Sequence, residues 1–208
     1  MTPFRSTFLI AVLLLAACAG RVEPSPSVSP PLVSVGDSWS YNGIGADGRP
    51  LSLEVEVLKV RPGEIVLRRN RIEATYSEPW IMTRTRTTEG WMSFSPGVPT
   101  VPFPLIPGTT LRHRTETIDD RGNKGSIETI LIASRWEEIE VPAGRFRAVR
   151  VDREEEVTFA GAPARRSQAG TFWYSPQARV YIRMHEVIDP ARKTFRTLEL
   201  RSYALRQP

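Results

Sequence analysis

Residues 51 to 57 read Leu-Ser-Leu-Glu-Val-Glu-Val, and this stretch decides the class of fold. Leu51, Leu53, Val55 and Val57 share one face of an extended chain, while the serine and the two glutamates share the other. Such strict alternation predicts a strand with one face in a core and the other in solvent. No stretch after residue 18 has a sustained apolar repeat at helical spacing, so we expect an all-β protein.

Similar segments follow along the rest of the chain, separated by turn sequences such as Arg-Pro-Gly at 61–63 and Pro-Ala-Gly at 142–144. We read Gly36-Asp37 as the turn before the first strand. The other candidate strands are 64–76, 80–88, 90–94, 111–118, 126–133, 136–141, 146–159, 171–174, 180–188 and 194–205. Many short strands with regular turns predict one curved antiparallel sheet in a single domain, as a half-barrel or open barrel.

One segment departs from this rhythm. Residues 95–108 read SPGVPTVPFPLIPG, and the five prolines remove the backbone donors that a central strand needs. We expect a long loop here, with Phe103 as its most prominent apolar side chain. Two interpretations stay open: a lid over a ligand cavity, or a structural plug that covers one end of the sheet.

The first residues form a targeting segment rather than part of the fold. A single positive charge in residues 1–5 precedes an apolar run from Phe8 to Ala17, which is too short to cross a membrane as a helix. The run ends in Leu15-Ala16-Ala17-Cys18, which resembles the lipobox of bacterial lipoproteins. That resemblance implies cleavage before Cys18 and a lipid (palmitate-type) anchor on the cysteine. The alternative is a plain secretory signal in which Cys18 is incidental.

The expected domain organisation follows from these boundaries. Residues 1–17 are a lipoprotein signal peptide, 18–32 a lipidated tether rich in proline and serine, and 33–208 the β-rich domain. Because Cys18 is the only cysteine, the mature domain can form no internal disulfide. Its stability must therefore come from its core.

Charge and composition argue against several functions. The net charge is +5, but basic residues alternate with acidic ones, as in Arg153-Glu154-Glu155-Glu156, whereas nucleic-acid binding calls for a basic cluster. We expect no nucleic-acid partner. The sequence contains two histidines and one cysteine, and that cysteine is the expected lipidation site. No zinc-type cluster is therefore available, so we expect no metal and no cofactor.

Catalytic motifs fail when tested residue by residue. Gly36-Asp37-Ser38 resembles the nucleophile box of GDS-type esterases, but neither His113 nor His185 stands in the Asp-x-x-His pattern that those enzymes use. A serine without a base is a poor nucleophile. The acidic loop from Asp119 lacks the glycine at the sixth position of a calcium loop, so we read it as a hairpin loop. We therefore expect a protein that is not an enzyme and has no catalytic residues.

Aromatic residues are the remaining candidates for ligand contact. In a concave β-structure, Trp80, Trp91, Trp173 and Phe103 could line an apolar cavity. Packing in a core is the alternative use of these side chains, and the sequence does not separate the two.

Short patterns through the domain resemble a broad group of bacterial exported β-proteins. The patterns are G-D-x-W-x-Y at residues 36–41, V-P-A-G-x-F at 141–146 and W-Y-x-P at 173–176. Each is a turn flanked by an aromatic residue, so they report fold rather than chemistry. In outline such proteins are similar to lipoprotein-carrier half-barrels, which enclose acyl chains, although clear helices for the carriers' lid are missing from this sequence.

These observations predict a monomeric, non-catalytic envelope lipoprotein, held in a membrane by its lipid, that binds an apolar ligand or another envelope component. The alternative is a structural or interaction lipoprotein with a filled core and no cavity. Ala19 after the cysteine predicts the outer membrane, on its periplasmic side, by the sorting rule for bacterial lipoproteins.

Overall fold

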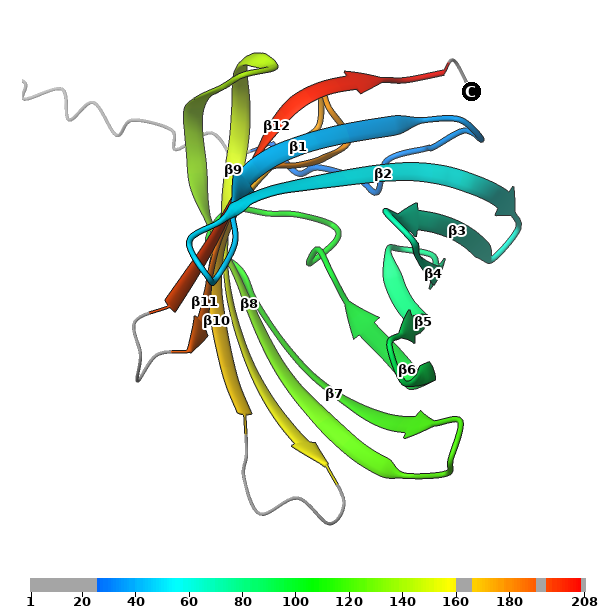
Figure 1. Ribbon diagram of the computed structural model, residues 1–208. Coiled ribbons are helices and arrows are strands. Elements are labelled where there is room, and N and C mark those ends of the chain that lie inside the picture. The colour runs from blue at the N-terminus through cyan, green and yellow to red at the C-terminus, as the bar shows by residue number, and fades with distance from the viewer. Residues whose placement is uncertain (1–25, 160–165, 190–193, 207–208) are drawn as a thin grey trace, which may run out of the picture.

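The computed structural model describes residues 26–159, 166–189 and 194–206. Within these residues the chain forms twelve strands and no helix (Figure 1). The strands are β1 (Ser38–Ile44), β2 (Pro50–Arg61), β3 (Glu64–Arg69), β4 (Ile72–Ser77), β5 (Ile81–Thr87), β6 (Gly90–Pro99), β7 (Thr110–Asp119), β8 (Lys124–Val141), β9 (Gly144–Phe159), β10 (Arg166–Ser175), β11 (Val180–Asp189) and β12 (Thr194–Ala204). No helix long and apolar enough to cross a membrane occurs among the described residues.

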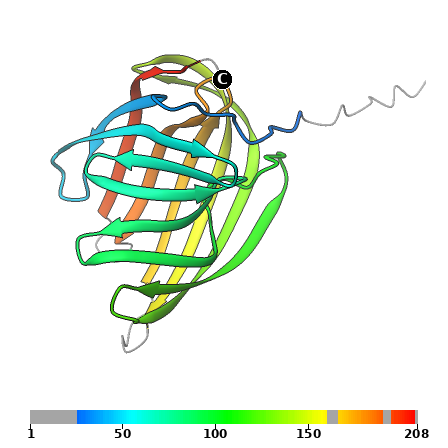
Figure 2. The same ribbon diagram turned by 90° about the vertical axis from the view of Figure 1, so that its right-hand side faces the viewer.

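The strands form a closed antiparallel barrel in which each pairs with its neighbours in the chain, and β1 pairs with β12 to complete the circle (Figure 2). The predicted fold class, an all-β antiparallel barrel in one domain, is confirmed. The sheet closes fully, where the sequence suggested a half-barrel or open barrel. The turn at Gly36-Asp37 does precede the first strand, which begins at Ser38.

Closure of the barrel depends on a close approach between β1 and β12. Gly43 pairs with Leu198 across this seam. A Cβ atom at Gly43 would lie 1.8 Å from the backbone oxygen of Thr197, so any other residue would force the two strands apart.

Two predicted strand boundaries differ from the observed ones. The segment 64–76 is two strands, because Asn70 adopts a positive φ of 54° and turns the chain between β3 and β4. Conversely, 126–133 and 136–141 form the single 18-residue strand β8. A register shift between Ala133 and Trp136 absorbs the irregularity without ending the pairing with β9.

The core consists of two clusters of buried side chains. One gathers around Trp39 and Tyr41 of β1, and the other around Tyr174 of β10, Leu131 of β8 and Leu105 of the long loop. Trp39 is 1% exposed, and its indole Nε1 donates a hydrogen bond to the Ala178 carbonyl at 2.7 Å. Four aromatic residues of the short sequence patterns are therefore core residues: Trp39, Tyr41, Phe146 and Tyr174.

The proline-rich segment begins as a strand, contrary to the prediction of a loop from residue 95. β6 continues to Pro99, where Val98 and Pro99 pair with Met82 and Ile81 of β5. Its pairing with β7 ends at Ser95. Beyond that point side chains of β7 replace the ladder: Thr115 Oγ1 donates to the Gly97 carbonyl at 2.6 Å. Pro96 and Pro99 are tolerated because this stretch lacks a full partner strand on one side.

Residues 100–109 form the loop between β6 and β7, called here the plug loop. Leu105 is fully buried, and Val101 is 7% exposed. Val28 forms an isolated antiparallel bridge with Leu105, with N···O distances of 2.9 Å in both directions. Packing against the barrel thus includes a residue ahead of position 33, where we expected the folded domain to begin.

Candidate functional site

A cavity of about 570 Å³ lies inside the barrel. Alternate residues of the strands point into this cavity, and in its middle these side chains are apolar. The side chains that line this middle region include Leu53, Val55, Leu67, Phe172, Met184 and Leu198. A cavity of a few hundred cubic ångströms with apolar walls is typical of a small-molecule binding site.

One end of this cavity, called here the mouth, is formed by exposed residues. Asn70 and Gln168 line it and are exposed, and Ile72 is 42% exposed. The mouth also includes Arg69, whose side chain follows Leu67 on the inward face of β3. No ion pair of Arg69 is found among the described residues.

Charged side chains from three strands form a cluster in the wall near the mouth. Glu186 of β11 accepts hydrogen bonds from Arg153 Nη2 of β9 at 3.0 Å and from Arg196 Nε of β12 at 2.7 Å. Arg153 also lies 4.3 Å from the centre of the Phe172 ring, a cation–π contact. The Glu186 side chain is 13% exposed, so two arginines neutralise a largely buried carboxylate.

The opposite end of the cavity is closed by the plug loop. Thr100 and Val101 line this end. The loop is held by polar contacts: Thr100 Oγ1 donates to the Trp80 carbonyl at 2.8 Å, and Tyr181 Oη donates to the Thr100 carbonyl at 2.7 Å. Burial raises the pKa of Tyr181 well above its ordinary value, so its hydroxyl stays a donor at neutral pH.

Trp80, Tyr174 and Arg179, called here the floor, line the cavity together with the plug loop. Tyr174 is 2% exposed, and its ring meets Phe103 edge to face at 5.3 Å between centroids. Both Trp80 Nε1 and Tyr174 Oη are buried without a hydrogen-bond partner among the described residues. Buried polar atoms without a partner are uncommon in folded proteins.

The structure separates the four predicted ligand-binding aromatic residues. Trp80 lines the cavity. Phe103 does not line the cavity; it belongs to the plug loop and packs against Tyr174. The inward aromatic residues Phe172, Tyr174 and Tyr181 were not among the four predicted ligand-binding residues, although strand alternation around residue 173 is the signal that places two of them on the face opposite Trp173.

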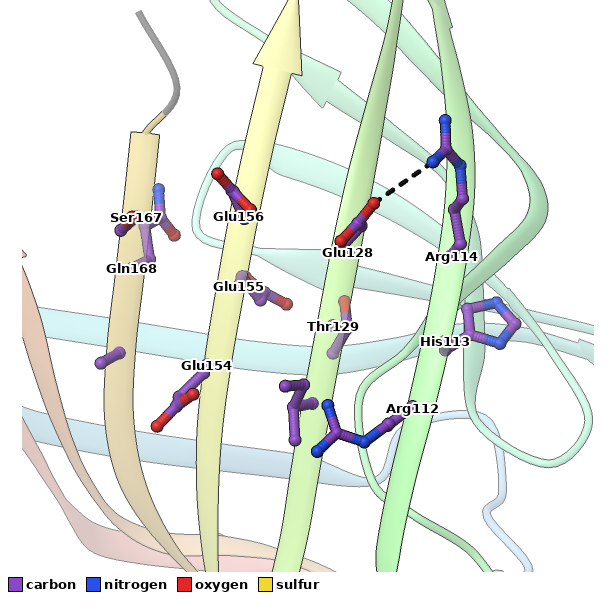
Figure 3. A pocket seen from close by; sticks show the side chains of 12 residues that line it. Arg112, His113, Arg114, Glu128, Thr129, Glu154, Glu155, Glu156, Ser167 and Gln168 are labelled. Carbon is purple, nitrogen blue, oxygen red and sulfur yellow. Dashed lines mark hydrogen bonds and ion pairs between the residues drawn. The ribbon is translucent and has the colours of Figure 1, made fainter.

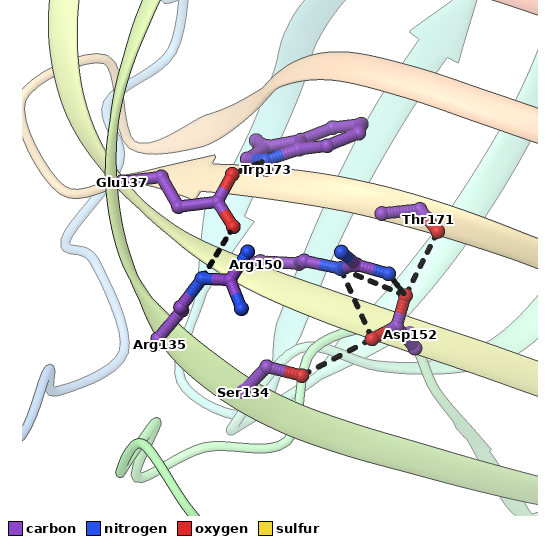
Figure 4. A network of polar contacts seen from close by, with 7 residues as sticks. All are labelled: Ser134, Arg135, Glu137, Arg150, Asp152, Thr171 and Trp173. Carbon is purple, nitrogen blue, oxygen red and sulfur yellow. Dashed lines mark hydrogen bonds and ion pairs between the residues drawn. The ribbon is translucent and has the colours of Figure 1, made fainter.

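Trp91 and Trp173 are used elsewhere. The Arg84 guanidinium lies over the Trp91 ring, 4.2 Å from its centre. Trp173 lies on the outer face of β10, and its Nε1 donates to Glu137 Oε2 at 2.7 Å (Figure 4). Neither tryptophan is among the described residues that line the cavity. Cys18, the predicted lipidation site, lies outside the described residues.

A polar network surrounds Trp173 on the same outer face (Figure 4). Asp152 accepts hydrogen bonds from Arg150 Nη2 at 2.9 Å, from Thr171 Oγ1 at 2.8 Å and from Ser134 Oγ at 3.1 Å. Partial burial acts to raise the pKa of Asp152, but these hydrogen bonds outweigh it and hold the pKa below its ordinary value. The network ties β8, β9 and β10 together.

A second hollow of about 660 Å³ lies on the outer wall of β7 to β10 (Figure 3). It is lined mainly by charged residues, among them Arg112, Arg114, Glu128 and Glu154. Arg114 already pairs with Glu128 at 3.2 Å, as the dashed line in Figure 3 shows. Because exposed pairs of opposite charge interact weakly and show no single preferred ligand, we favour the internal cavity as the functional site.

Residues tested for catalysis have structural partners. Asp37 is fully buried and accepts hydrogen bonds from the backbone N–H groups of Ser34, at 3.0 Å, and of Arg206. The two histidines lie apart: His113 Nε2 contacts the Gly97 carbonyl at 2.8 Å, and His185 packs against Phe195.

The loop from Asp119 is a hairpin turn between β7 and β8, as predicted. The Asp119 carboxylate accepts hydrogen bonds from the Asn123 side chain and backbone N–H, both at 2.8 Å, and from the backbone N–H of Arg121 at 2.9 Å. The hydrogen bond from the Asn123 side chain is the largest of the effects that lower the pKa of Asp119. The carboxylate thus serves to hold its own turn.

Comparison with known proteins identifies the fold. The chain matches no protein-family model and no curated protein. Among solved structures, it is similar to a predicted lipoprotein from Parabacteroides distasonis, with a TM-score of 0.52 and 13% identity over 85% of this chain and 97% of that one. It is also similar to a predicted exported protein with a YmcC-like fold from Bacteroides fragilis, with a TM-score of 0.51 and 15% identity over 86% of this chain and 99% of that one. At these identities the likeness establishes a shared barrel architecture.

Proposed function

We propose that this chain is a non-catalytic, lipid-anchored protein of the bacterial envelope whose barrel holds an apolar ligand in its internal cavity. The observation that carries the proposal is the cavity of about 570 Å³, with an apolar middle, an exposed mouth and an end closed by the plug loop. The alternative, a structural protein with a filled core, does not account for this space. The lipoprotein and exported-protein descriptions of the two similar structures support the envelope assignment.

The anchor proposal follows from the leader sequence. Cleavage before Cys18 would leave seven residues between the lipidated cysteine and Pro26, the first described residue. An extended chain spans about 3.3–3.6 Å per residue, so the lipid would hold the plug-loop end of the barrel within about 30 Å of the membrane. Ala19 favours the outer membrane, facing the periplasm.

Lipidation is tested by metabolic labelling with a radioactive fatty acid. We expect the label on the wild-type protein and none on C18A, because the thioether has no other acceptor in the chain. Label on C18A would contradict the anchor. Membrane fractionation then tests the location, and recovery only with the inner membrane would contradict the outer-membrane proposal.

Ligand binding is tested with N-phenyl-1-naphthylamine, an uncharged probe that fluoresces in apolar surroundings. The sample is residues 19–208, which include everything that the structure describes. We expect saturable binding by the wild type and at least a tenfold loss of affinity in L53W, because an indole at this cavity-lining position fills the space. The matched control is I132W: Ile132 lies on the barrel wall, 37% exposed and outside the described cavity lining.

The result is decisive in either direction. Saturable binding that L53W abolishes and I132W leaves within twofold of wild type supports the proposal. Absence of saturable binding by the wild type, or equal losses in both variants, would overturn it.

A further inference from the structure

Two rows of inward-pointing residues run side by side across strands β9 to β12, and the register of these strands defines both rows. Residues in register on neighbouring antiparallel strands have Cβ atoms about 4.5–5.5 Å apart, so each row is a continuous strip of the inner wall. One strip, called here the apolar row, consists of Val151, Phe172, Met184 and Leu198. The next strip toward the mouth, called here the charged row, consists of Arg153, Gly170, Glu186 and Arg196. The wall therefore changes from apolar to charged between two adjacent rows.

Gly170 allows the charged side chains of this row to meet. It stands between Arg153 and Glu186 in the register and has no side chain, and Arg153 Nη2 donates to Glu186 Oε1 at 3.0 Å. A Cβ atom at Gly170 would lie 2.8 Å from Cε2 of Phe172, so the Phe172 ring covers this position. The Arg153 guanidinium lies 4.3 Å from the centre of that ring. An aromatic ring and a carboxylate thus hold the Arg153 guanidinium where the apolar row ends.

The charged row carries more positive than negative charge. Its two arginines share one carboxylate, because Arg196 Nε donates to Glu186 Oε2 at 2.7 Å while Arg153 holds Oε1. The Arg153 and Arg196 side chains are 21% and 37% exposed, so both reach open space. Among the described residues, Nη1 of neither arginine makes a hydrogen bond. The row therefore has N–H donors and one positive charge left for a ligand.

The rest of the cavity adds to this positive charge. Glu186 is the one acidic residue among the described residues that line the cavity, and five arginines line it: Arg69, Arg86, Arg153, Arg179 and Arg196. Glu155, 3.9 Å from Arg153, and Asp37, 3.5 Å from Arg179, lie outside that lining, and with them the balance is five arginines to three carboxylates. A concave space with apolar walls concentrates such a field, so it attracts anions and repels cations.

We infer that the cavity binds a single-chain amphiphile with an anionic head group, whose head lies at the charged row and whose alkyl chain lies along the apolar row toward the plug loop. Carboxylate and phosphate oxygens accept hydrogen bonds from guanidinium groups, and the apolar row begins directly beside those groups. A cavity of about 570 Å³ has the size of a site for one small molecule, which favours one alkyl chain. This inference rests on the proposed function and adds the ligand class and its orientation.

The test measures how three amphiphiles with the same dodecyl chain displace N-phenyl-1-naphthylamine from residues 19–208 at neutral pH, below the concentrations at which they form micelles. The three are anionic dodecyl phosphate, uncharged dodecanol and cationic dodecyltrimethylammonium. We expect dodecyl phosphate to displace the probe at about a tenfold lower concentration than dodecanol, because hydrogen bonds to an ionised group are about twice as strong as neutral ones. Dodecyltrimethylammonium should be the weakest of the three. Dodecanoate as a fourth arm shows whether a carboxylate head serves equally, and a preference for either anion over dodecanol supports the inference.

Two variants of the charged row should change this preference in opposite directions. R196Q removes a positive charge and should lower the preference for the anion at least fivefold. E186Q removes the negative charge and should raise the preference about threefold, even if it lowers the urea midpoint, and a purely structural role of Glu186 would not produce that rise. The matched control is R201Q, the same change on the same strand: Arg201 is exposed, pairs with Glu54 at 3.4 Å and is outside the described cavity lining. It should keep the preference within twofold.

Equal displacement by the anionic and uncharged amphiphiles would overturn the inference. A preference that R196Q and E186Q leave unchanged and R179Q removes would overturn the orientation, because it would place the head group at the plug-loop end. The naphthylamine probe separates these failures from failure of the proposed function. If the probe binds saturably and no preference is seen, the inference alone is wrong. If the probe does not bind, the proposed function is wrong as well.

Discussion

The plug loop should be a structural element whose removal from the core costs stability rather than ligand affinity. Leu105 is the residue to change, because its side chain is fully buried between Val28 and the second core cluster. A Leu→Ala change at a fully buried site costs about 2–5 kcal/mol through lost transfer free energy and the cavity left behind. We expect L105A to lower the free energy of unfolding by about 3 kcal/mol.

The same loop supplies graded controls. Ile106 is 37% exposed, so I106A should cost under about 1 kcal/mol. Phe103 is half-buried against Tyr174, and F103A should fall between the two, at about 2 kcal/mol. Phe103 is not among the described residues that line the cavity, so F103A should keep naphthylamine affinity within about twofold.

Urea denaturation followed by tryptophan fluorescence, with probe titration on the same samples, measures all three variants. The plug interpretation requires the order L105A, F103A, I106A in lost stability. Equal small losses in all three, together with a large loss of probe affinity in F103A, would refute it and establish a lid.

Three further predictions concern the frame of the barrel. Asp37→Ala should lower the free energy of unfolding by about 3 kcal/mol in urea, since hydrogen bonds to charged groups contribute about 1.5–3 kcal/mol each; a loss below about 1 kcal/mol would contradict its role. The pKa of Asp152 is lower in the folded state than in the unfolded state, so its ionised carboxylate stabilises the fold above the unfolded pKa of about 4, and this stabilisation is lost as pH falls through the folded pKa. D152N should therefore be less stable than wild type at pH 7 and equal to it near pH 2. A difference in stability that does not change with pH would refute this. A chain that begins at Val33 should melt at lower urea than one that begins at Pro26, because it loses the Val28 bridge to the plug loop, and identical midpoints would show that the bridge contributes nothing.

The class of fold could be predicted because local alternation carries it. The pattern of residues 51–57 reappears as the inward face of β2, where Val55 and Val57 are buried. Turn sequences marked most strand ends correctly. Closure could not be predicted, because it depends on pairing between β1 and β12, the two ends of the domain, and on a close approach at Gly43 that no local pattern reveals.

The candidate site could be predicted only in part, and for a related reason. Alternation separates Trp173 from Phe172 and Tyr174 in β10, but it does not show which of the two faces is the inner one. In the structure Trp173 points outward to Glu137, while its neighbours Phe172 and Tyr174 point inward. Trp80 could be named from the sequence as a candidate, but its unpartnered indole N–H becomes evident only from the packed structure.

The most direct test of the central proposal is an NMR measurement of methionine methyl groups. With the methyl carbons labelled in residues 19–208, Met82, Met92 and Met184 give separate signals, and Met184 lines the cavity while the other two do not. Titration with N-phenyl-1-naphthylamine should shift the Met184 signal strongly, because an aromatic ring in the cavity lies against that methyl group, and should shift Met82 and Met92 much less. An unchanged Met184 signal under saturating probe would contradict the account that this barrel binds its ligand inside.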